Sequence, residues 1–154
     1  MLCIVNVKWV SLFMLSVSIE LILMIVLILL NGYFSLSEIA LLSVKKSRLK
    51  HLSKLGNKNA YHALFLTRKS SEMLSTIQIG ITMIGIFAGA FGGAIIAEHL
   101  ENVLSKFSFI SAYSEPISVL LVVIVITFFS LVIGELVPKQ IALSNPEKFS
   151  LDVA

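Results

Sequence analysis

Three long apolar stretches, separated by polar segments, dominate the chain. The first, Leu21 to Val44, begins as unbroken Leu, Ile, Val and Met, and the second, Ile77 to Ala97, contains no charged residue. The third runs from Ile117 to Ile133. At 1.5 Å per residue, the 24 residues of the first stretch make a helix of about 36 Å, enough to cross a bilayer with some tilt. The pattern predicts three transmembrane helices, over about residues 20–44, 72–97 and 116–138.

The N-terminal 19 residues are apolar as well, but they do not fit a standard membrane element. They contain Asn6 and Lys8 and run into Glu20 without a turn signal. A signal peptide would carry its basic residues before the apolar region. We therefore treat residues 1–19 as an unplaced leader and expect it to be interfacial or loosely structured, with a fourth span as the alternative.

Composition places the chain among integral membrane proteins. Hydrophobic residues make up 57% of the 154 residues and charged residues 14%, a balance that soluble domains do not show. The basic residues cluster beside the apolar spans, which indicates membrane flanks and argues against nucleic-acid binding. A single cysteine, Cys3, permits no internal disulfide and joins no Cys/His cluster. The sequence carries no enzyme signature, so we do not expect an enzyme.

Lys and Arg are divided unequally between the two sides of the membrane. Ten lie in the 45–69 loop and the tail after the third span, and only Lys8 and Lys106 lie on the other side. The positive-inside rule then predicts a multi-pass protein of the cell membrane, with the N-terminus outside and a cytoplasmic tail beginning at residues 145–154. Helix formers around Gly56 and Asn57 predict two short amphipathic helices along the membrane surface. A solvated positive flank is the simpler alternative.

The main candidate for chemistry is Glu135, at the end of the third stretch. A carboxylate near membrane depth costs about 2.5 to more than 10 kcal/mol, so it normally pairs with a cation or faces a polar cavity. Pro138 lacks the N–H that a helix would donate to the carbonyl of Gly134. We therefore expect a freed carbonyl beside a carboxylate. The alternative is a structural ion pair between Glu135 and Lys139, four residues on.

The other two spans also carry polar or small residues on single faces. Asn31 and Ser35 are four apart, as are Gln78 and Thr82, and such pairs share a helix face. A small-residue ridge that would let two helices approach closely follows on the second span: Gly85, Gly89 and Gly93. Alternatively, hydroxyls such as those of Ser35 and Thr82 only bond back to their own helix.

Taken together, these candidates offer only oxygen ligands. Carboxylate, amide, hydroxyl and carbonyl oxygens suit hard cations such as Mg²⁺, Ca²⁺ or Na⁺. The three histidines do not contribute, because His51 and His62 lie in the loop and His99 lies on the opposite side of the membrane. The sequence alone therefore predicts a binding site for a hard cation near Glu135.

Four segments resemble a known family: Asn-Gly-Tyr-Phe-Ser-Leu-Ser-Glu-Ile-Ala-Leu (31–41), Lys-Lys-Ser-Arg-Leu (45–49), Leu-Ser-Thr-Ile-Gln-Ile-Gly-Ile-Thr (74–82) and Gly-Glu-Leu-Val-Pro-Lys (134–139). They are similar to the transmembrane domain of the CorC/CNNM family, also called the hemolysin C or TlyC family. The resemblance covers about residues 20–154 and is carried most specifically by the last segment. It implies an all-α membrane domain over residues 20–144, with three transmembrane helices and a juxtamembrane helical segment, that forms a homodimer.

The resemblance also implies a function and a site. Members are held to bind Mg²⁺ and to export it coupled to Na⁺. Carried to this chain, the metal ligands would be Glu135, the Gly134 carbonyl, Ser35 and Asn31, with Thr82 close to the usual ligand position of the second span. Two departures stand out, since relatives have serine at the position of Asn31 and asparagine at that of Ile81.

Relatives continue into paired cytoplasmic CBS domains and a small C-terminal domain that residues 1–154 do not include, which indicates an excised membrane domain or a truncated protein. The rival hypothesis is a membrane anchor and dimer scaffold for such regulatory domains, moving no ion.

Overall fold

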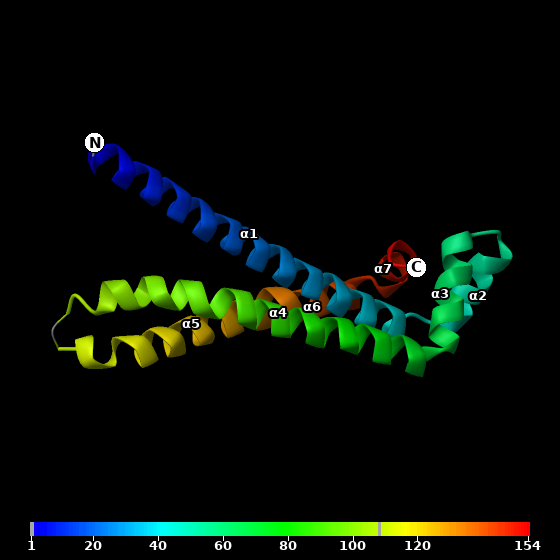
Figure 1. The fold of residues 1–154 in the computed structure, drawn as a ribbon. Coiled ribbons are helices and arrows are strands. Elements are labelled where there is room, and N and C mark those ends of the chain that lie inside the picture. Colours follow the sequence, from blue (N-terminus) through cyan, green and yellow to red (C-terminus); the bar gives the residue numbers. More distant parts are fainter. Residues whose placement is uncertain (1, 108) are drawn as a thin grey trace. The chain divides into compact units, whose positions relative to one another are not determined.

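The computed structural model describes residues 2–107 and 109–154, without the side chains of residues 2–17 and 91–95. Every regular element in these two ranges is helical. In chain order they are α1 (Leu2–Ser43), α2 (Lys46–Lys54), α3 (Lys58–Arg68), α4 (Ser70–Leu104), η1 (Ser111–Tyr113), α5 (Ser114–Leu131), η2 (Val132–Leu136), α6 (Val137–Ser144) and α7 (Pro146–Asp152) (Figure 1). The short η1 is a 3₁₀-helix and η2 is a π-helix.

Within the described residues, three helical segments are long and apolar enough to cross a membrane, as the sequence predicts. They are Ser18–Ser43, Ser70–Ala90 and Ser111–Ser144. Their large apolar side chains are widely exposed, for example Ile22 at 61% and Ile86 at 66%, as expected for surfaces solvated by lipid. The helix of the second span is longer than expected, because α4 continues to Leu104.

The N-terminal leader is helical rather than loosely structured, and its place at the membrane interface stays a prediction. Helix α1 begins at Leu2 and runs without a break into the first span. No Gly or Pro lies between Leu2 and Leu30, so nothing in the sequence ends the helix before the span begins. The side chains of Asn6 and Lys8, on which the expectation rested, lie outside the described residues.

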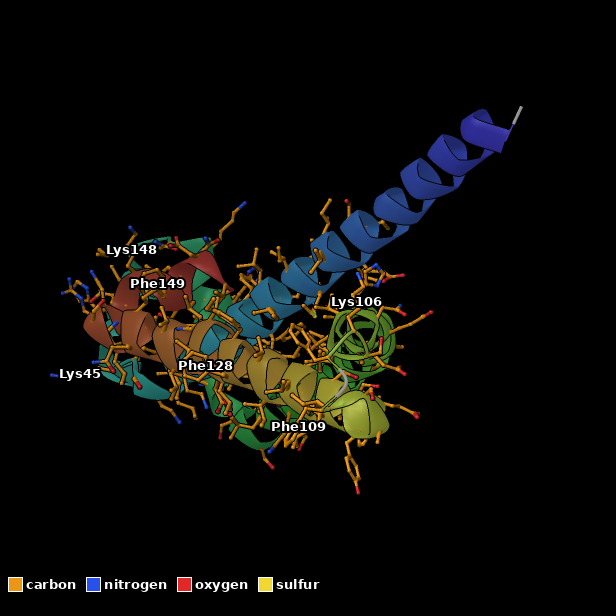
Figure 2. The ribbon with its side chains drawn as sticks, turned by 90° about the vertical axis from the view of Figure 1, so that its left-hand side faces the viewer. Lys45, Lys106, Phe109, Phe128, Lys148 and Phe149 are labelled. Atoms are coloured by element: carbon orange, nitrogen blue, oxygen red, sulfur yellow. The ribbon has the colours of Figure 1, made fainter. Side chains whose placement is uncertain are left out.

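The chain divides into two compact units, the first made of residues 1–27 and 86–128. In this unit the turn between α4 and α5 carries Lys106 and Phe109 (Figure 2), and Phe109 is almost fully exposed. Helix α5 begins with buried serines that bond to nearby carbonyls, from Ser114 Oγ to Ser111 O at 3.1 Å and from Ser118 Oγ to Glu115 O at 2.8 Å. Each of these buried hydroxyls is therefore satisfied locally.

The second unit comprises residues 28–85 and 129–154. Its apolar core joins the end of α1, the α2–α3 hairpin and the start of α4, through Leu41, Val44, Leu49, Ala60, Ala63, Met73 and Ile77. The hairpin confirms the two short loop helices that the sequence predicts. Gly56 turns the chain with φ of +89°, a conformation that favours glycine, and the Asn57 side chain accepts from Ala60 N at 3.0 Å to cap α3.

Helix α7 is tied back to this hairpin by side-chain bonds. Arg48 Nε lies 3.0 Å from both carboxylate oxygens of Glu147, and Asn59 Nδ2 donates to Leu151 O at 2.9 Å. Lys45 and Lys148 lie at this end of the unit (Figure 2). The C-terminal segment therefore packs on the basic hairpin, even though 99 residues separate Arg48 from Glu147.

Candidate cation site between α1 and η2

Two glycines allow α1 and η2 to pack almost backbone to backbone. A Cβ added at Gly32 would lie 3.0 Å from Pro138 Cγ and 3.2 Å from the carbonyl oxygen of Ile133. A Cβ at Gly134 would lie 3.1 Å from Asn31 Nδ2 and 3.3 Å from the carbonyl oxygen of Ile28. Contacts this short leave no room for a larger side chain unless the helices move apart. The crossing places the Asn31 side chain of α1 against the backbone of η2 at Gly134.

The π-helix arises where Pro138 interrupts the hydrogen-bond ladder. Val137 N bonds to Val132 O, five residues back, which widens the turn. Pro138 cannot donate to Gly134 O in α-helical register or to Ile133 O in π register, because it has no N–H. The sequence predicts the freed Gly134 carbonyl, whereas the wide turn itself was not anticipated.

The freed carbonyl is bound by a side chain from α1. Asn31 Nδ2 donates to Gly134 O at 3.0 Å, and Asn31 is 92% buried, with a relative exposure of 8%. Because a carbonyl can only accept, the amide nitrogen must face Gly134, and this fixes Asn31 Oδ1 on the other side. Asn31 Oδ1 is buried and has no hydrogen-bond partner among the described residues.

Within the second unit, Ser35 has another buried oxygen, Oγ, without a partner among the described residues. It lies one turn beyond Asn31 on the same face of α1, its exposure is 0%, and its Oγ bonds to no described group. The nearby Ser37, in contrast, donates Oγ to Tyr33 O at 2.7 Å. Back-bonding therefore explains Ser37 but not Ser35. Two adjacent buried oxygens that lack donors are unusual, because each costs about 1–3 kcal/mol.

Glu135 forms an ion pair with Lys139, which the sequence leaves open as the alternative to a cation ligand. Lys139 Nζ lies 2.7 Å from Glu135 Oε1, and the two side chains are 31% and 40% exposed, respectively. Glu135 directly follows Gly134 in η2. An ammonium already neutralises the carboxylate, and an incoming cation would have to displace or share it.

The second span contributes less than the sequence suggests. Thr82 is exposed and donates Oγ1 to Gln78 O at 2.8 Å, which is the back-bonded alternative for this hydroxyl. No described atom lies within 4 Å of a Cβ added at Gly85 or at Gly89. Gly93 lies in the segment 91–95, outside the described side chains.

Ile81, where the family resemblance implies an asparagine ligand, has an apolar environment. Its side chain packs against the core cluster of the second unit, together with Phe34. The preceding Gly80 also contacts Phe34, since an added Cβ would lie 3.2 Å from Phe34 Cε1. Among the residues that the structure describes, Asn31 contacts Gly134 directly, Ser35 lies one turn from Asn31 and Glu135 follows Gly134. Thr82 bonds to its own helix instead.

The arrangement is chemically suited to a hard cation and lacks the features of other metal sites. No three His, Cys, Asp or Glu side chains come together within the described part of the chain. The available atoms are an amide oxygen, a hydroxyl oxygen, a carbonyl oxygen and one carboxylate, the ligand types preferred by Mg²⁺, Ca²⁺ and Na⁺. Gly32 is the site residue that sequence reasoning missed, although its place directly after Asn31 was a usable signal.

Comparison with known proteins identifies the family. The model of the cyclin M transmembrane N-terminal domain, CNNM, matches residues 22–154. A UPF0053 protein of Synechocystis sp. is 50% identical over 139 residues, which cover 90% of this chain and 31% of the relative. The UPF0053 protein YhdP of Bacillus subtilis is 35% identical over 133 residues, which cover 86% of this chain and 30% of YhdP.

A relative with a functional name is more distant. The polyamine export protein of Haemophilus influenzae is 27% identical over 129 residues, which cover 84% of this chain and 30% of that protein. The chain thus spans about a third of the length of the curated relatives it matches. With the family match extending over the spans, the hairpin and the crossing of α1 with η2, the chain belongs to the CNNM transmembrane domain family.

Proposed function

We propose that this chain is the membrane domain of a cation transporter whose substrate is Mg²⁺, bound between α1 and η2. The carrying observation is the pair of buried acceptors without partners, Asn31 Oδ1 and Ser35 Oγ. A cation would supply the positive charge that both oxygens lack, and the Glu135 carboxylate beside the Gly134 carbonyl would balance its charge. A single carboxylate gives weak charge compensation, which favours release as well as capture.

Direction and coupling come from the family resemblance. The resemblance implies a homodimer that exports Mg²⁺ coupled to Na⁺. A site with only oxygen ligands is compatible with both ions. The relative named as a polyamine exporter suggests another cargo, since the ammonium groups of a polyamine also bind to carboxylate and carbonyl oxygens. Both substrates are cations, so the test must include both.

A scaffold that moves no ion is the second candidate, and two observations favour it. Glu135 already pairs with Lys139 at 2.7 Å, and Ile81 packs into the apolar core where relatives carry a ligand. In such a protein, the polar residues at the crossing would only fix how α1 meets η2. The two functions differ in whether Ser35 matters to ion binding.

The first experiment measures thermal stability of the detergent-purified protein against Mg²⁺, Ca²⁺, Mn²⁺, Na⁺ and spermidine. A ligand at 100 times its dissociation constant adds about 2.7 kcal/mol. Ser35→Ala should keep the fold and even stabilise the ion-free protein, because it removes a buried hydroxyl without a partner. The same variant should lose the response to Mg²⁺.

Ser37→Ala is the matched control, since Ser37 is also buried on α1 but bonds to its own helix. It should respond to Mg²⁺ like the parent. Glu135→Gln should lose the response and, in liposomes, the Mg²⁺ flux. A Ser35→Ala variant that responds to Mg²⁺ as the parent does would move the site elsewhere. No response of the parent to any ion would favour the scaffold, and a response to spermidine alone would favour polyamine cargo.

A further inference from the structure

The second unit contains a cavity among α1, α3 and α4 that shares no lining residue with the candidate cation site. Its volume is about 410 Å³. Val153, from the C-terminal end of the chain, lines it as well. Most of its lining is apolar: Tyr33, Phe34, Leu41, Phe65, Met73 and Ile77. The lining spans the last turns of α1 and the first turns of α4, so the cavity lies at the ends of two membrane spans, beside the basic hairpin.

Four polar side chains on its wall already bond within the chain: Ser37, Thr76, Lys69 and Glu72. Ser37 Oγ donates to Tyr33 O at 2.7 Å, Thr76 Oγ1 to Glu72 O at 2.9 Å, and Lys69 Nζ lies 3.1 Å from Glu72 Oε2. None of these groups needs a polar ligand to complete its bonding. A cavity with this lining suits a hydrocarbon chain better than a polar solute.

A smaller hollow of about 230 Å³ adjoins the same phenylalanine and has the opposite character. It is lined by Ser53, Tyr61, Leu64, Phe65 and Arg68. Two hydroxyls and a guanidinium form the donor set that phosphate oxygens accept from, with Arg as the strongest member. Phe65 lines both spaces, so the two spaces lie beside one residue.

Charge around the hollow favours an anion strongly. The segment from Lys45 to Lys69 contains eight Lys and Arg and no Asp or Glu. Exposed apolar side chains accompany these charges, with Leu55 71%, Tyr61 60% and Phe65 52% exposed. Cations beside exposed aromatic residues, next to membrane spans, are typical of segments that lie in the headgroup layer of an anionic leaflet.

We infer that the α2–α3 hairpin and the adjoining ends of α1 and α4 bind one anionic phospholipid, with its phosphate at Arg68, Ser53 and Tyr61 and an acyl chain in the 410 Å³ cavity. The basic residues of the hairpin favour an anionic headgroup. The mostly apolar lining of the cavity favours an acyl chain. The site is separate from the cation site, so either can fail without the other.

The test compares lipids of identical chains by native mass spectrometry and by thermal stability of delipidated protein in detergent. Phosphatidylglycerol should remain bound as one molecule and raise the midpoint, whereas phosphatidylcholine should need about tenfold more lipid for the same rise. Glycerol phosphate, which has the anion without the chains, should give no rise. A rise with glycerol phosphate equal to that with the lipid would overturn the acyl-chain half of the inference.

Two pairs of variants separate the headgroup from the chain. Arg68→Gln should weaken phosphatidylglycerol binding about tenfold, and Lys58→Gln, the same charge change at an exposed position of α3, should not. Thr76→Phe should fill the cavity and abolish binding, while Ile79→Phe, on an exposed face of α4, should leave it intact. Equal loss in Arg68→Gln and Lys58→Gln would show unspecific charge attraction. If Thr76→Phe instead changes the oligomeric state and retains lipid, the cavity belongs to a contact with a second copy.

Discussion

Asn31 Nδ2 on α1 donates a hydrogen bond to the carbonyl oxygen of Gly134 at 3.0 Å, although the two residues are 103 positions apart. In an α-helix this carbonyl would accept from the N–H of residue 138, which Pro138 lacks. A side chain of α1 thereby replaces a backbone hydrogen bond that is missing after η2. This bond also fixes the orientation of the amide, so Asn31 Oδ1 is turned away from Gly134 and left without a donor among the described groups.

Asn31→Ala should destabilise the protein by about 1–3 kcal/mol, because the Gly134 carbonyl then lies buried without a donor and a small void is added. Removing Asn31 Oδ1 offsets only part of that cost. Thermal unfolding in detergent, without added ions, would measure the change. Asn59→Ala, which removes an exposed bond to Leu151 O, should cost clearly less. If the two variants are equally stable, the bond to Gly134 does not hold the crossing together.

Gly32→Ala should separate α1 from η2. The added Cβ would lie 3.0 Å from Pro138 Cγ and 3.2 Å from Ile133 O, and overpacking of this kind costs about 1–3 kcal/mol. Gly85→Ala is the matched control, because its Cβ would contact nothing within 4 Å in the chain. It should instead stabilise α4 by about 0.5–1 kcal/mol through helix propensity.

The same pair of variants can be examined by size-exclusion chromatography with light scattering. Should the small-residue ridge form the predicted dimer interface, Gly85→Ala would weaken the dimer while leaving the monomer intact. Gly32→Ala would have the reverse pattern, a less stable chain with an unchanged association. A Gly32→Ala variant as stable as Gly85→Ala would contradict the close approach of α1 and η2.

Lys139→Gln should strengthen the response to Mg²⁺ if Lys139 Nζ occupies the carboxylate that a cation needs. Without ions, the variant should be less stable, because Glu135 loses its partner at 2.7 Å. Adding Mg²⁺ should restore the stability, with half of the effect at about tenfold lower concentration than in the parent. Lys148→Gln, at the exposed end of the same unit, is the control. A loss of stability that no cation restores would assign Glu135 a structural role.

Ile81→Asn tests whether the missing ligand of the second span can be returned. In the absence of ions it should cost about 1–3 kcal/mol, since an amide would enter the apolar cluster around Phe34. A site that retains its other ligands should gain Mg²⁺ affinity, seen as a larger rise in the unfolding midpoint per added Mg²⁺. Ile81→Ala, which loses the same packing without supplying an oxygen, separates the two effects. A pure scaffold should show only the loss.

Much of this architecture could be predicted because it depends on local sequence. Long apolar runs determine the three spans, Gly56 and Asn57 place the turn of the hairpin, and Pro138 frees the Gly134 carbonyl whatever surrounds it. The unbroken helix through the leader was missed because Asn6 and Lys8 were given more weight than the absence of Gly and Pro. In each case the relevant information lies within one continuous segment of the chain.

The site itself could be predicted only in part, because its contacts join distant residues. Sequence spacing places Asn31 and Ser35 on one face, but it cannot show that the Asn31 amide bonds to Gly134 while Ser35 bonds to nothing described. Thr82 and Ser35 are both span hydroxyls in i, i+4 pairs, and only the structure separates the back-bonded one from the buried one. The sequence also leaves open whether Glu135 pairs with Lys139 or with an ion. In the structure, Glu135 pairs with Lys139.

The π-helix makes the segment before Pro138 sensitive to chain length. One wide turn holds a residue more than an α-helix of the same rise would. Deleting a single residue there, such as Ile133, would let the segment wind as an ordinary helix and rotate everything after it by about 100°. Pro138 would then leave Gly32, and Lys139 and Ala142 would turn to new faces. Insertions and deletions in residues 132–136 should therefore be tolerated far less than substitutions at the exposed positions of the same stretch.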